Sequence, residues 1–393
     1  MTASMDNNNP PSQEEAPDRS FFFRAVGFFT GDMKRCGKWV KKQSVVIQLL
    51  DCIFRGVAQV MFINNPLSGL LVAVGLFLQN PWWALNGLIG TLVSTVSAFF
   101  LGQNREAISA GLYGYNGTLV GILMAVFSAN GSWYWWLLLP NVFMSIALSS
   151  IASKWDLPIF TLPFNILVCL HIAATGAAHP YFPEVYVSQV NASCLQLFLS
   201  VPVGVGQVYG CDSPWTGGLI LLALLLCSPT ICFHAMLGSA AGMFTGLALA
   251  APNGDIYSGL WGYNSALSCI AIGGVFYVIT WQTHLLMSLI SCVMLPSSHD
   301  IPFFQLALPA CTWPFCLSTL IFLLISSEIP AICRLPLSVV SYPEENRRYR
   351  RQLKALEKAQ RSQQSGSQEE ARPKENGRPT VHLQVERGCS ESV

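Results

Sequence analysis

Two threonines lie in a repeated motif whose chemistry suits a binding site for a neutral solute. The motif reads Leu-Pro-x-x-Thr-x-Pro-Phe, and its copies span residues 157–164 and 308–315. A regular helix cannot run undisturbed through either copy, because proline lacks a backbone N–H and restricts the residue before it. Each copy therefore places a hydroxyl group, that of Thr161 or Thr312, beside a break in the backbone. A backbone broken twice at membrane depth is typical of a pore or transport site.

The other polar residues that recur in both halves of the chain are also uncharged. They are Gln59 and Gln207, and Asn116 and Asn264. Amide and hydroxyl oxygens accept hydrogen bonds from N–H donors, and carbonyl groups freed at a helix break add acceptors. Thr and Gln in membrane helices often serve only helix packing, and the Gly-rich surroundings of the Asn residues suit close packing equally well. Occurrence in matching copies favours a role in the site for the Thr and Gln pairs, whereas it leaves the Tyr-Asn pairs at 115–116 and 263–264 undecided between the site and helix packing.

Aromatic residues near the motifs indicate the shape of the solute. The rings that could form flat apolar walls are those of Phe160, Phe164, Phe182 and Phe315. Ion-coupled carriers usually place a charged side chain or a histidine within a span. The polar residues that match between the halves carry no charge. Together these features favour a flat, neutral molecule with many N–H groups.

The composition is that of a membrane-embedded protein. Apolar residues make up 52% of the chain, charged residues 11%, and the mean hydropathy is +0.45, which no ordinary soluble domain shows. All but three of the 22 Lys and Arg lie in residues 1–55 or 343–393. Basic clusters mark the cytosolic side of a membrane protein, so both termini are expected in the cytosol and the number of spans is even. The first twenty residues have no apolar core of a secretory signal.

The chain contains an internal duplication. Residues 56–60 (Gly-Val-Ala-Gln-Val) match residues 204–208 (Gly-Val-Gly-Gln-Val) at an offset of 148 residues. The same offset relates residues 111–116 to 259–264, and it relates Pro66 to Pro214 and Pro81 to Pro229. At the threonine motif the offset is 151 residues. One offset held over several separated stretches is a strong sign of duplication.

Each half has about five apolar segments and one segment broken by proline. The apolar segments are expected near 44–62, 66–79, 82–101, 110–128, 132–152 and 158–177, and near 195–210, 214–228, 231–251, 259–280, 283–296 and 303–326. Several are shorter than the roughly 20 residues that a straight span needs. If one segment per half only re-enters the membrane, each half crosses five times and the halves have opposite orientations. The sequence therefore predicts an all-α polytopic membrane protein of two inverted repeats.

The predicted organisation has five parts. These are a cytosolic N-terminal tail (1–43), a first membrane repeat (44–178), an extracellular linker (179–194), a second membrane repeat (195–335) and a cytosolic C-terminal tail (336–393). In the C-terminal tail we expect a charged surface helix from 343 to about 361 and disorder beyond it. Three N-glycosylation sequons occur, and the one in the extracellular linker, Asn191, is the best candidate; those at Asn116 and Asn130 rank below it.

No pattern typical of an enzyme is present in the sequence. The thirteen cysteines include no CxxC pair and no metal-like spacing with histidine. Most of them lie within apolar runs, where a free thiol behaves as a small hydrophobic side chain. We therefore expect no catalytic residues, no metal, no cofactor and no nucleic-acid partner.

Five stretches closely resemble the vertebrate urea transporters. They are residues 59–69, 112–121, 155–158 with 161–165, 281–286 and 308–316, and residues 342–347 extend the match. The resemblance covers about residues 20–350, and the doubled threonine motif is close to diagnostic of the family. Residues 140–155 and 287–305 differ from the family pattern, and both segments precede a threonine motif.

The resemblance implies a urea channel in the plasma membrane. In that family two inverted five-span repeats, each with a re-entrant half-helix, enclose one pore per protomer of a homotrimer. The implied pore-lining residues are Thr161 and Thr312 as the central pair, Gln59 and Gln207 in the outer acceptor ladders, Leu112 and Leu260 in the apolar walls, and Phe182 at a pore mouth.

The expected activity is therefore passive permeation of urea through neutral oxygen acceptors and apolar walls in the lipid bilayer. One alternative is a channel for another small neutral solute, such as water, ammonia or a urea analogue. A second alternative is an ion-coupled carrier, against which the uncharged repeats argue. A third is an enzyme, against which the lack of a nucleophile–base or metal constellation argues.

Overall fold

Helices dominate the structure, which is a computed structural model. It describes residues 27–128, 158–175, 194–293, 309–324 and 332–370. In these ranges the only pairing between extended segments is an isolated bridge between Tyr277 and Arg334. The chain divides into two compact units, residues 1–347 and 348–393. The candidate site lies in the first unit.

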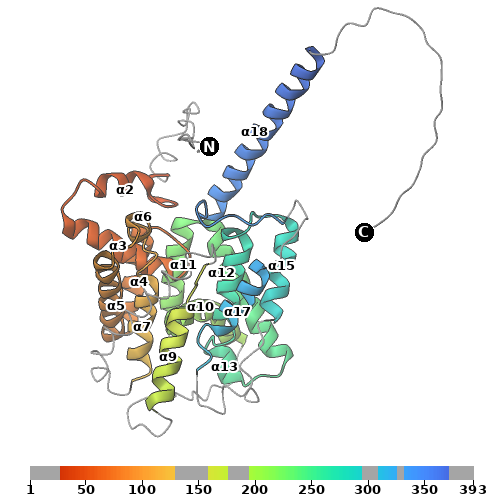
Figure 1. The fold of residues 1–393 in the computed structure, drawn as a ribbon. Helices are drawn as coiled ribbons and strands as arrows, with labels where there is room; N and C mark the ends of the chain where they lie inside the picture. Colours follow the sequence, from red (N-terminus) through yellow and green to blue (C-terminus); the bar gives the residue numbers. More distant parts are fainter. Residues whose placement is uncertain (1–26, 129–157, 176–193, 294–308, 325–331, 371–393) are drawn as a thin grey trace, which may run out of the picture. The chain divides into compact units, whose positions relative to one another are not determined.

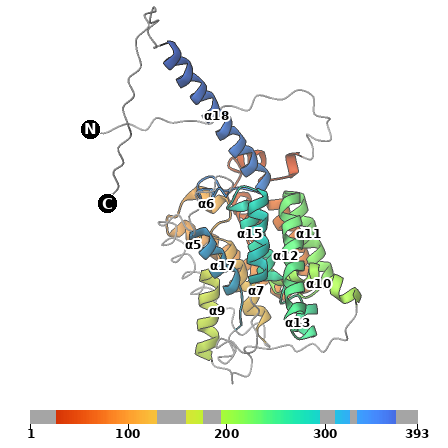
Figure 2. The same cartoon turned by 90° about the vertical axis from the view of Figure 1, so that its right-hand side faces the viewer.

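The helices of the two halves follow the same order. In the first half they are α2 (Lys34–Val40), α3 (Val45–Gln59), α4 (Pro66–Gln79), α5 (Pro81–Phe100), α6 (Arg105–Ser109), α7 (Tyr115–Val126) and α9 (Leu162–Thr175). In the second half they are α10 (Cys194–Gly206), η3 (Gln207–Tyr209), α11 (Pro214–Cys227), α12 (Pro229–Ala248), α13 (Asn253–Tyr257), α14 (Tyr263–Ile270), the π-helical turn η4 (Ala271–Val275), α15 (Trp281–Val293) and α17 (Trp313–Leu324). Figure 1 shows α5 and α7 at one flank of the bundle and α12 and α15 at the other, and Figure 2 shows α12 and α15 side by side.

Four long helices begin in the same way. Each of α4, α5, α11 and α12 has proline at its first position, where the missing N–H costs nothing. Asn65 and Asn80 cap α4 and α5 by accepting two backbone N–H bonds each, and Ser228 caps α12. These starts lie at the positions that the duplication predicts.

Most predicted segments are helices in the structure, with three differences. Helices α7 and α14 begin at Tyr115 and Tyr263 instead of at 110 and 259, because Gly111 and Gly259 adopt φ of +76° and +77°. Helices α9 and α17 begin directly after the threonines, so the first part of each motif is not helical. Helix α18 (Pro343–Glu370) runs beyond the predicted end near 361. The predicted segment 132–152 lies outside the described residues.

The two halves pack against each other through α4 and α11. Ser68 Oγ donates to the Ala223 carbonyl oxygen at 2.7 Å, and Thr216 Oγ1 donates to the Gly75 carbonyl oxygen at 3.4 Å. Both donors and both acceptors are related by the offset of 148 residues. Because the start of each helix meets the later part of the other, α4 and α11 are antiparallel.

Glycine allows the closest helix crossing within each half. A Cβ at Gly69 would lie 1.8 Å from the Phe54 carbonyl oxygen, and one at Gly217 would lie 1.9 Å from the Pro202 carbonyl oxygen. No side chain fits at either position without displacing the backbone. The sequence duplication is therefore accompanied by a duplicated helix contact.

Two described helices are long and apolar enough to cross a membrane alone. They are Pro81–Phe100 and Pro229–Ala248, and they match at the offset of 148 residues. Residues 195–209 and 214–227 would form a third span, bent by 77°. The shorter apolar helices in the described ranges are 66–79, 115–126, 162–173, 263–275 and 313–324. Short and bent apolar helices are typical of broken spans and re-entrant segments.

Candidate functional site

The two motif threonines are in direct contact. Thr161 Oγ1 and Thr312 Oγ1 lie 2.5 Å apart, and each side chain is 3% exposed. The Thr161 and Thr312 carbonyl oxygens accept the first helical hydrogen bonds of α9 and α17, from the N–H groups of Asn165 and Cys316 at 3.0 Å. The structure therefore brings together, at two helix starts, residues that lie 151 positions apart in the sequence.

The residue before each threonine has a strained backbone. Phe160 and Cys311 occupy the same position in the two motifs, and their φ angles are +50° and +42°. A left-handed conformation in a non-glycine residue costs of order 1–3 kcal/mol and persists only when its surroundings hold it. The break in each motif is thus a specific conformation that neighbouring residues must stabilise.

A Tyr-Asn pair stabilises each break. The Phe160 carbonyl oxygen accepts from Tyr115 Oη at 2.6 Å and from Asn116 Nδ2 at 3.1 Å. The matching pair, Tyr263 and Asn264, donates to the Cys311 carbonyl oxygen at 2.5 and 3.1 Å. The sequence left these pairs undecided between the site and helix packing, and the structure shows that they hold the motif backbone.

Asn165 and Cys316 complete the polar centre, and the sequence analysis did not select either of them. Asn165 Oδ1 accepts from the Thr312 N–H at 3.0 Å and from Thr312 Oγ1 at 2.9 Å, whereas Cys316 Sγ lies 3.1 Å from Thr161 Oγ1. Each follows the threonine of its own motif by four residues and contacts the threonine of the other motif. That spacing is the signal that would have identified them.

The two predicted glutamines make matching contacts. Gln59 Nε2 donates to the Ala110 carbonyl oxygen at 3.0 Å, and Gln207 Nε2 donates to the Ser258 carbonyl oxygen at 2.7 Å. These bonds orient each amide, and no described residue donates to either Oε1 atom. Both oxygens therefore remain free to accept a hydrogen bond from a solute.

A cavity of about 310 Å³ reaches from Gln59 to Thr161. It brings together three of the predicted site residues, the third being Leu112, whose side chain is 46% exposed. Gln207, Leu260 and Thr312 do not line this cavity. Phe182 and the predicted glycosylation site Asn191 lie outside the described residues.

Four phenylalanines close the inner part of the cavity. They are Phe62, Phe160, Phe276 and Phe315, whose ring centroids lie 5.0–6.1 Å apart in edge-to-face pairs. A flat molecule held between two parallel rings needs about 7 Å between them, twice a carbon contact distance. The rings of Phe160 and Phe315, which were expected to form flat walls, therefore pack against each other with no room for a flat molecule between them. Phe164, the third described ring of that prediction, is buried in the core.

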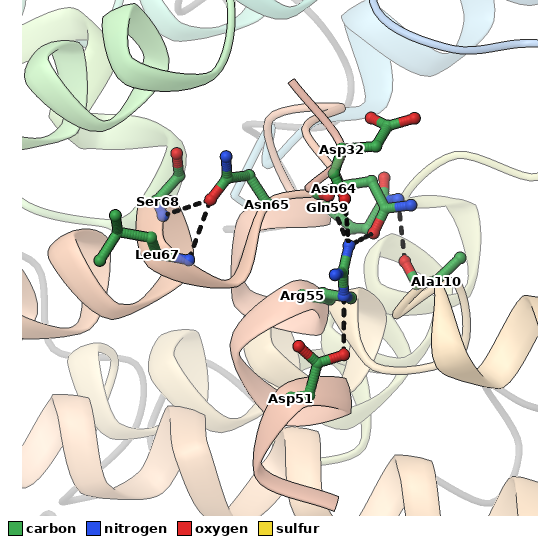
Figure 3. Close-up of polar contacts among 9 residues, drawn as sticks. All are labelled: Asp32, Asp51, Arg55, Gln59, Asn64, Asn65, Leu67, Ser68 and Ala110. Atoms are coloured by element: carbon green, nitrogen blue, oxygen red, sulfur yellow. Dashed lines mark hydrogen bonds and ion pairs between the residues drawn. The ribbon is translucent and has the colours of Figure 1, made fainter. Parts of the chain in front are cut away.

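A buried ion pair stands beside the cavity in the first half only. Arg55 is 4% exposed; its Nε donates to Asp51 Oδ2 at 2.8 Å, and its Nη1 donates to the Asn64 and Asp32 carbonyl oxygens at 2.7 and 3.0 Å (Figure 3). Asn64 and Asp32 both line the cavity. At the matching positions the second half has Val203 and Leu199 instead of Arg55 and Asp51.

The described part of the chain offers no cluster for a metal ion. Among these residues no group of three or more His, Cys, Asp or Glu side chains is placed to bind one. The polar groups at the site are hydroxyls, amides, a thiol and backbone carbonyls. Such a set can bind a neutral hydrogen-bonding solute.

Comparisons with known proteins agree with the geometry of the site. A family model described as "Urea transporter" matches residues 50–327. The chain is similar to Urea transporter 1 of Rattus norvegicus, with 53% identity over 344 residues, 82% of this chain and 89% of the relative. It is also similar to Urea transporter 1 of Mus musculus (52% over 345 residues, 83% and 89%) and of Ovis aries (51% over 344 residues, 82% and 89%).

Proposed function

Because the chain belongs to the urea transporter family, we propose that it conducts urea passively across the plasma membrane. It is a multi-pass membrane protein of this family, not an enzyme, so transport requires no bond to be made or broken. The observation that carries the proposal is the contact between Thr161 and Thr312, where two broken helices meet. The contact supports a pathway with neutral acceptors at its centre.

The proposed mechanism exchanges water for oxygen acceptors of the protein. Urea has four N–H donors and one carbonyl acceptor, and it loses hydration in a narrow passage. Free amide oxygens of Gln59 and Gln207 and the threonine hydroxyls offer replacement bonds along the way. Each replacement bond is worth only about 0.5–1.5 kcal/mol net, so urea is bound at each step without being trapped. The four phenylalanines and Leu112 supply apolar walls, and Leu260 and Phe182 serve the other side.

Two inverted repeats are supported by the contacts between the halves. The hydrogen bond from Ser68 to Ala223 and the one from Thr216 to Gly75 exchange donor and acceptor positions between the halves, which is the pattern that a two-fold axis produces. The helices that they join, α4 and α11, are antiparallel. A direct contact between the matched threonines is what such an axis produces. We propose five spans and one re-entrant half-helix per half, with repeats at 44–178 and 195–335. Both motif threonines come from one chain, which supports a pore within each protomer.

Both termini are proposed to lie in the cytosol. Ser341 and Glu345, after the last described helix of the bundle, contact Asp32 and Lys34, before the first expected span. This contact supports an even number of spans. The exposed cations of α2 and the following turn, Arg35, Lys38, Lys41 and Lys42, favour the cytosolic side. The linker at 179–194, with a glycan at Asn191, would then be extracellular, and the homotrimer is proposed on the family resemblance.

Stopped-flow efflux from proteoliposomes tests the proposed function. The purified protein should accelerate urea efflux far more than glycerol efflux, and a Na⁺ or proton gradient should not change the rate. Equal acceleration of water or ammonia, with none of urea, would favour the alternative channel. Uphill accumulation of urea driven by either gradient would show a carrier instead.

A further inference from the structure

A segment after the membrane helices covers one wall of the cavity. We define the C-terminal strap as residues 332–347. Its Leu335 N–H donates to the Phe276 carbonyl oxygen at 2.8 Å, and the buried Asn346 Nδ2 donates to the Gly274 and Val275 carbonyl oxygens, both at 2.9 Å. Phe276 and Val275 line the cavity. The strap is thus hydrogen-bonded to the inner wall of the proposed pathway.

The strap also meets the N-terminal segment at the cavity. Leu337, Val340, Ser341 and Tyr342 of the strap line it together with Asp32. Among the described residues that line the cavity, Asp32 is the only one with a charged side chain. A carboxylate at this place changes the charge of a pathway that is otherwise neutral.

Two carboxylates share a single hydroxyl group at this contact. Ser341 Oγ lies 3.0 Å from Asp32 Oδ2 and 3.0 Å from Glu345 Oε2. A serine hydroxyl has one hydrogen to donate, so it can satisfy only one carboxylate at a time. Both contacts can be hydrogen bonds at once only when one of the two carboxyl groups is protonated. That carboxyl group then donates to Ser341 Oγ, while the serine hydroxyl donates to the other carboxylate.

The surroundings favour Asp32 as the group that holds this proton. Glu345 is paired with Lys34 through its other oxygen. Figure 3 shows the Asp32 carboxylate directed away from Arg55, whose guanidinium instead binds the Asp32 backbone carbonyl. Burial, with a smaller contribution from Glu345, raises the pKa of Asp32 to about 6, although Ser341, Lys34 and Arg55 oppose the rise. Cys227 and Glu344 are further titratable groups on neighbouring elements, and Tyr342 lines the cavity beside Ser341.

We propose that Asp32, Ser341 and Glu345 form a proton-binding site that locks the C-terminal strap over the cavity. With the proton bound, Asp32 donates to Ser341 and Ser341 donates to Glu345, so both contacts are made. When the proton leaves for solvent, two carboxylates compete for one hydroxyl and repel each other, and the strap loosens. The proposal rests on the proposed function, because the covered cavity is the one assigned to urea.

Urea flux as a function of pH tests the lock. Efflux from proteoliposomes with equal pH on both sides should fall by up to about tenfold from about pH 7.5 to about pH 5, with a midpoint near 6, as Asp32 becomes protonated. D32N should give low flux at every pH, because the Asn amide N–H donates to Ser341 permanently. S341A should give high flux at every pH, because the bridge is absent.

The control is D255N, the same substitution in α13, away from the cavity, which should keep the wild-type profile. An infrared band of a protonated carboxyl group should titrate near pH 6 in the wild type and be missing in D32N. A flat wild-type profile, or D32N and S341A variants that follow the wild-type profile, would overturn the lock. In that case normal urea flux at pH 7.5 would leave the proposed function standing, whereas no urea flux at any pH would refute both.

Discussion

The interior of the molecule repeats itself, whereas its margins do not. Around the threonine pair, each half has a left-handed residue at the same motif position, a Tyr-Asn pair that donates to its carbonyl oxygen, and a hydrogen bond from a glutamine to a backbone carbonyl. Among the described residues, the buried Arg55–Asp51 pair and the π-helical turn η4 have no such duplicate. Even next to the threonines, Asn165 stands opposite Cys316.

This difference separates two tasks. A solute that passes in both directions meets the same acceptors in either order, so a matched interior suits passive permeation. The two sides of a membrane differ in composition and in what they bind, so we assign orientation and control to the unmatched parts under the proposed function. Substitutions can test this division by exchanging residues between the halves.

The largest expected effect is on stability, at the unmatched ion pair. R55V, which introduces the residue found at the matching position, leaves the Asp51 carboxylate buried without its cation. Removing one partner of a buried ion pair costs about 3–5 kcal/mol. Thermal unfolding of the purified protein in detergent should show a large fall in Tm.

The double variant R55V/D51L is the matched control. It gives the first half both residues of the second half, so no charge stays unpaired, and more than half of the lost stability should return. If the double variant is no more stable than R55V, the first half cannot accept the residues of the second half at these positions, and the two halves are not equivalent there.

The next effect is at the polar centre. N165C removes the acceptor of two Thr312 bonds, and a lost partner of a buried donor costs about 1–3 kcal/mol. We expect urea flux to fall about tenfold, since 1.4 kcal/mol is a factor of ten. The exchange variant N165C/C316N restores one amide and one thiol on opposite helices, and stopped-flow efflux should recover to within about threefold of the wild type. No recovery would mean that the halves are not equivalent at their centre.

A smaller and equal effect is expected at the tyrosines. Y115F and Y263F each remove one of two hydrogen bonds to the carbonyl of a left-handed residue, at a cost of about 1 kcal/mol. Urea flux should fall about fivefold in both variants. A severe loss in one variant and none in the other would break the symmetry of the interior.

The last effect concerns the pH dependence of stability at the strap. The raised pKa of Asp32, about 6 against an ordinary 3.8, means that the folded protein binds this proton more tightly than the unfolded chain. Stability from this group is therefore present at low pH and is lost as the pH rises from about 4 to about 6. Unfolding scans should show a steeper loss over this range in the wild type than in D32N. Parallel curves would show that Asp32 does not hold the proton.

The sequence predicted most of the repeated parts. A constant offset, prolines at helix starts and neutral residues in matching places identified the threonine and glutamine pairs and nearly all described helices. These features can be recognised in a single sequence because each occurs twice. Repetition also accompanies the accurate helix starts: α4 and α11 begin where predicted, at Pro66 and Pro214, whereas α7 and α14 begin five and four residues later than predicted.

The unmatched parts could not be predicted in the same way. Arg55 is one of many basic residues near the N-terminal end, and only the fold shows that it is buried against Asp51. Asp32, Ser341 and Glu345 are brought together across more than three hundred residues. Asn165 and Cys316 escaped notice because their types differ, although their spacing from the threonines is the same.

Urea efflux through variants of the threonine pair tests the central claim most directly. T161V and T312V each remove one hydroxyl acceptor from the contact at 2.5 Å. T319V makes the same change on α17, at a hydroxyl that has no hydrogen-bond partner among the described residues. In stopped-flow measurements with equal amounts of protein per vesicle, both motif variants should lose about tenfold or more of the urea flux, and T319V should match the wild type. Wild-type flux in both motif variants would contradict the assignment of the threonine pair as the centre of the pathway.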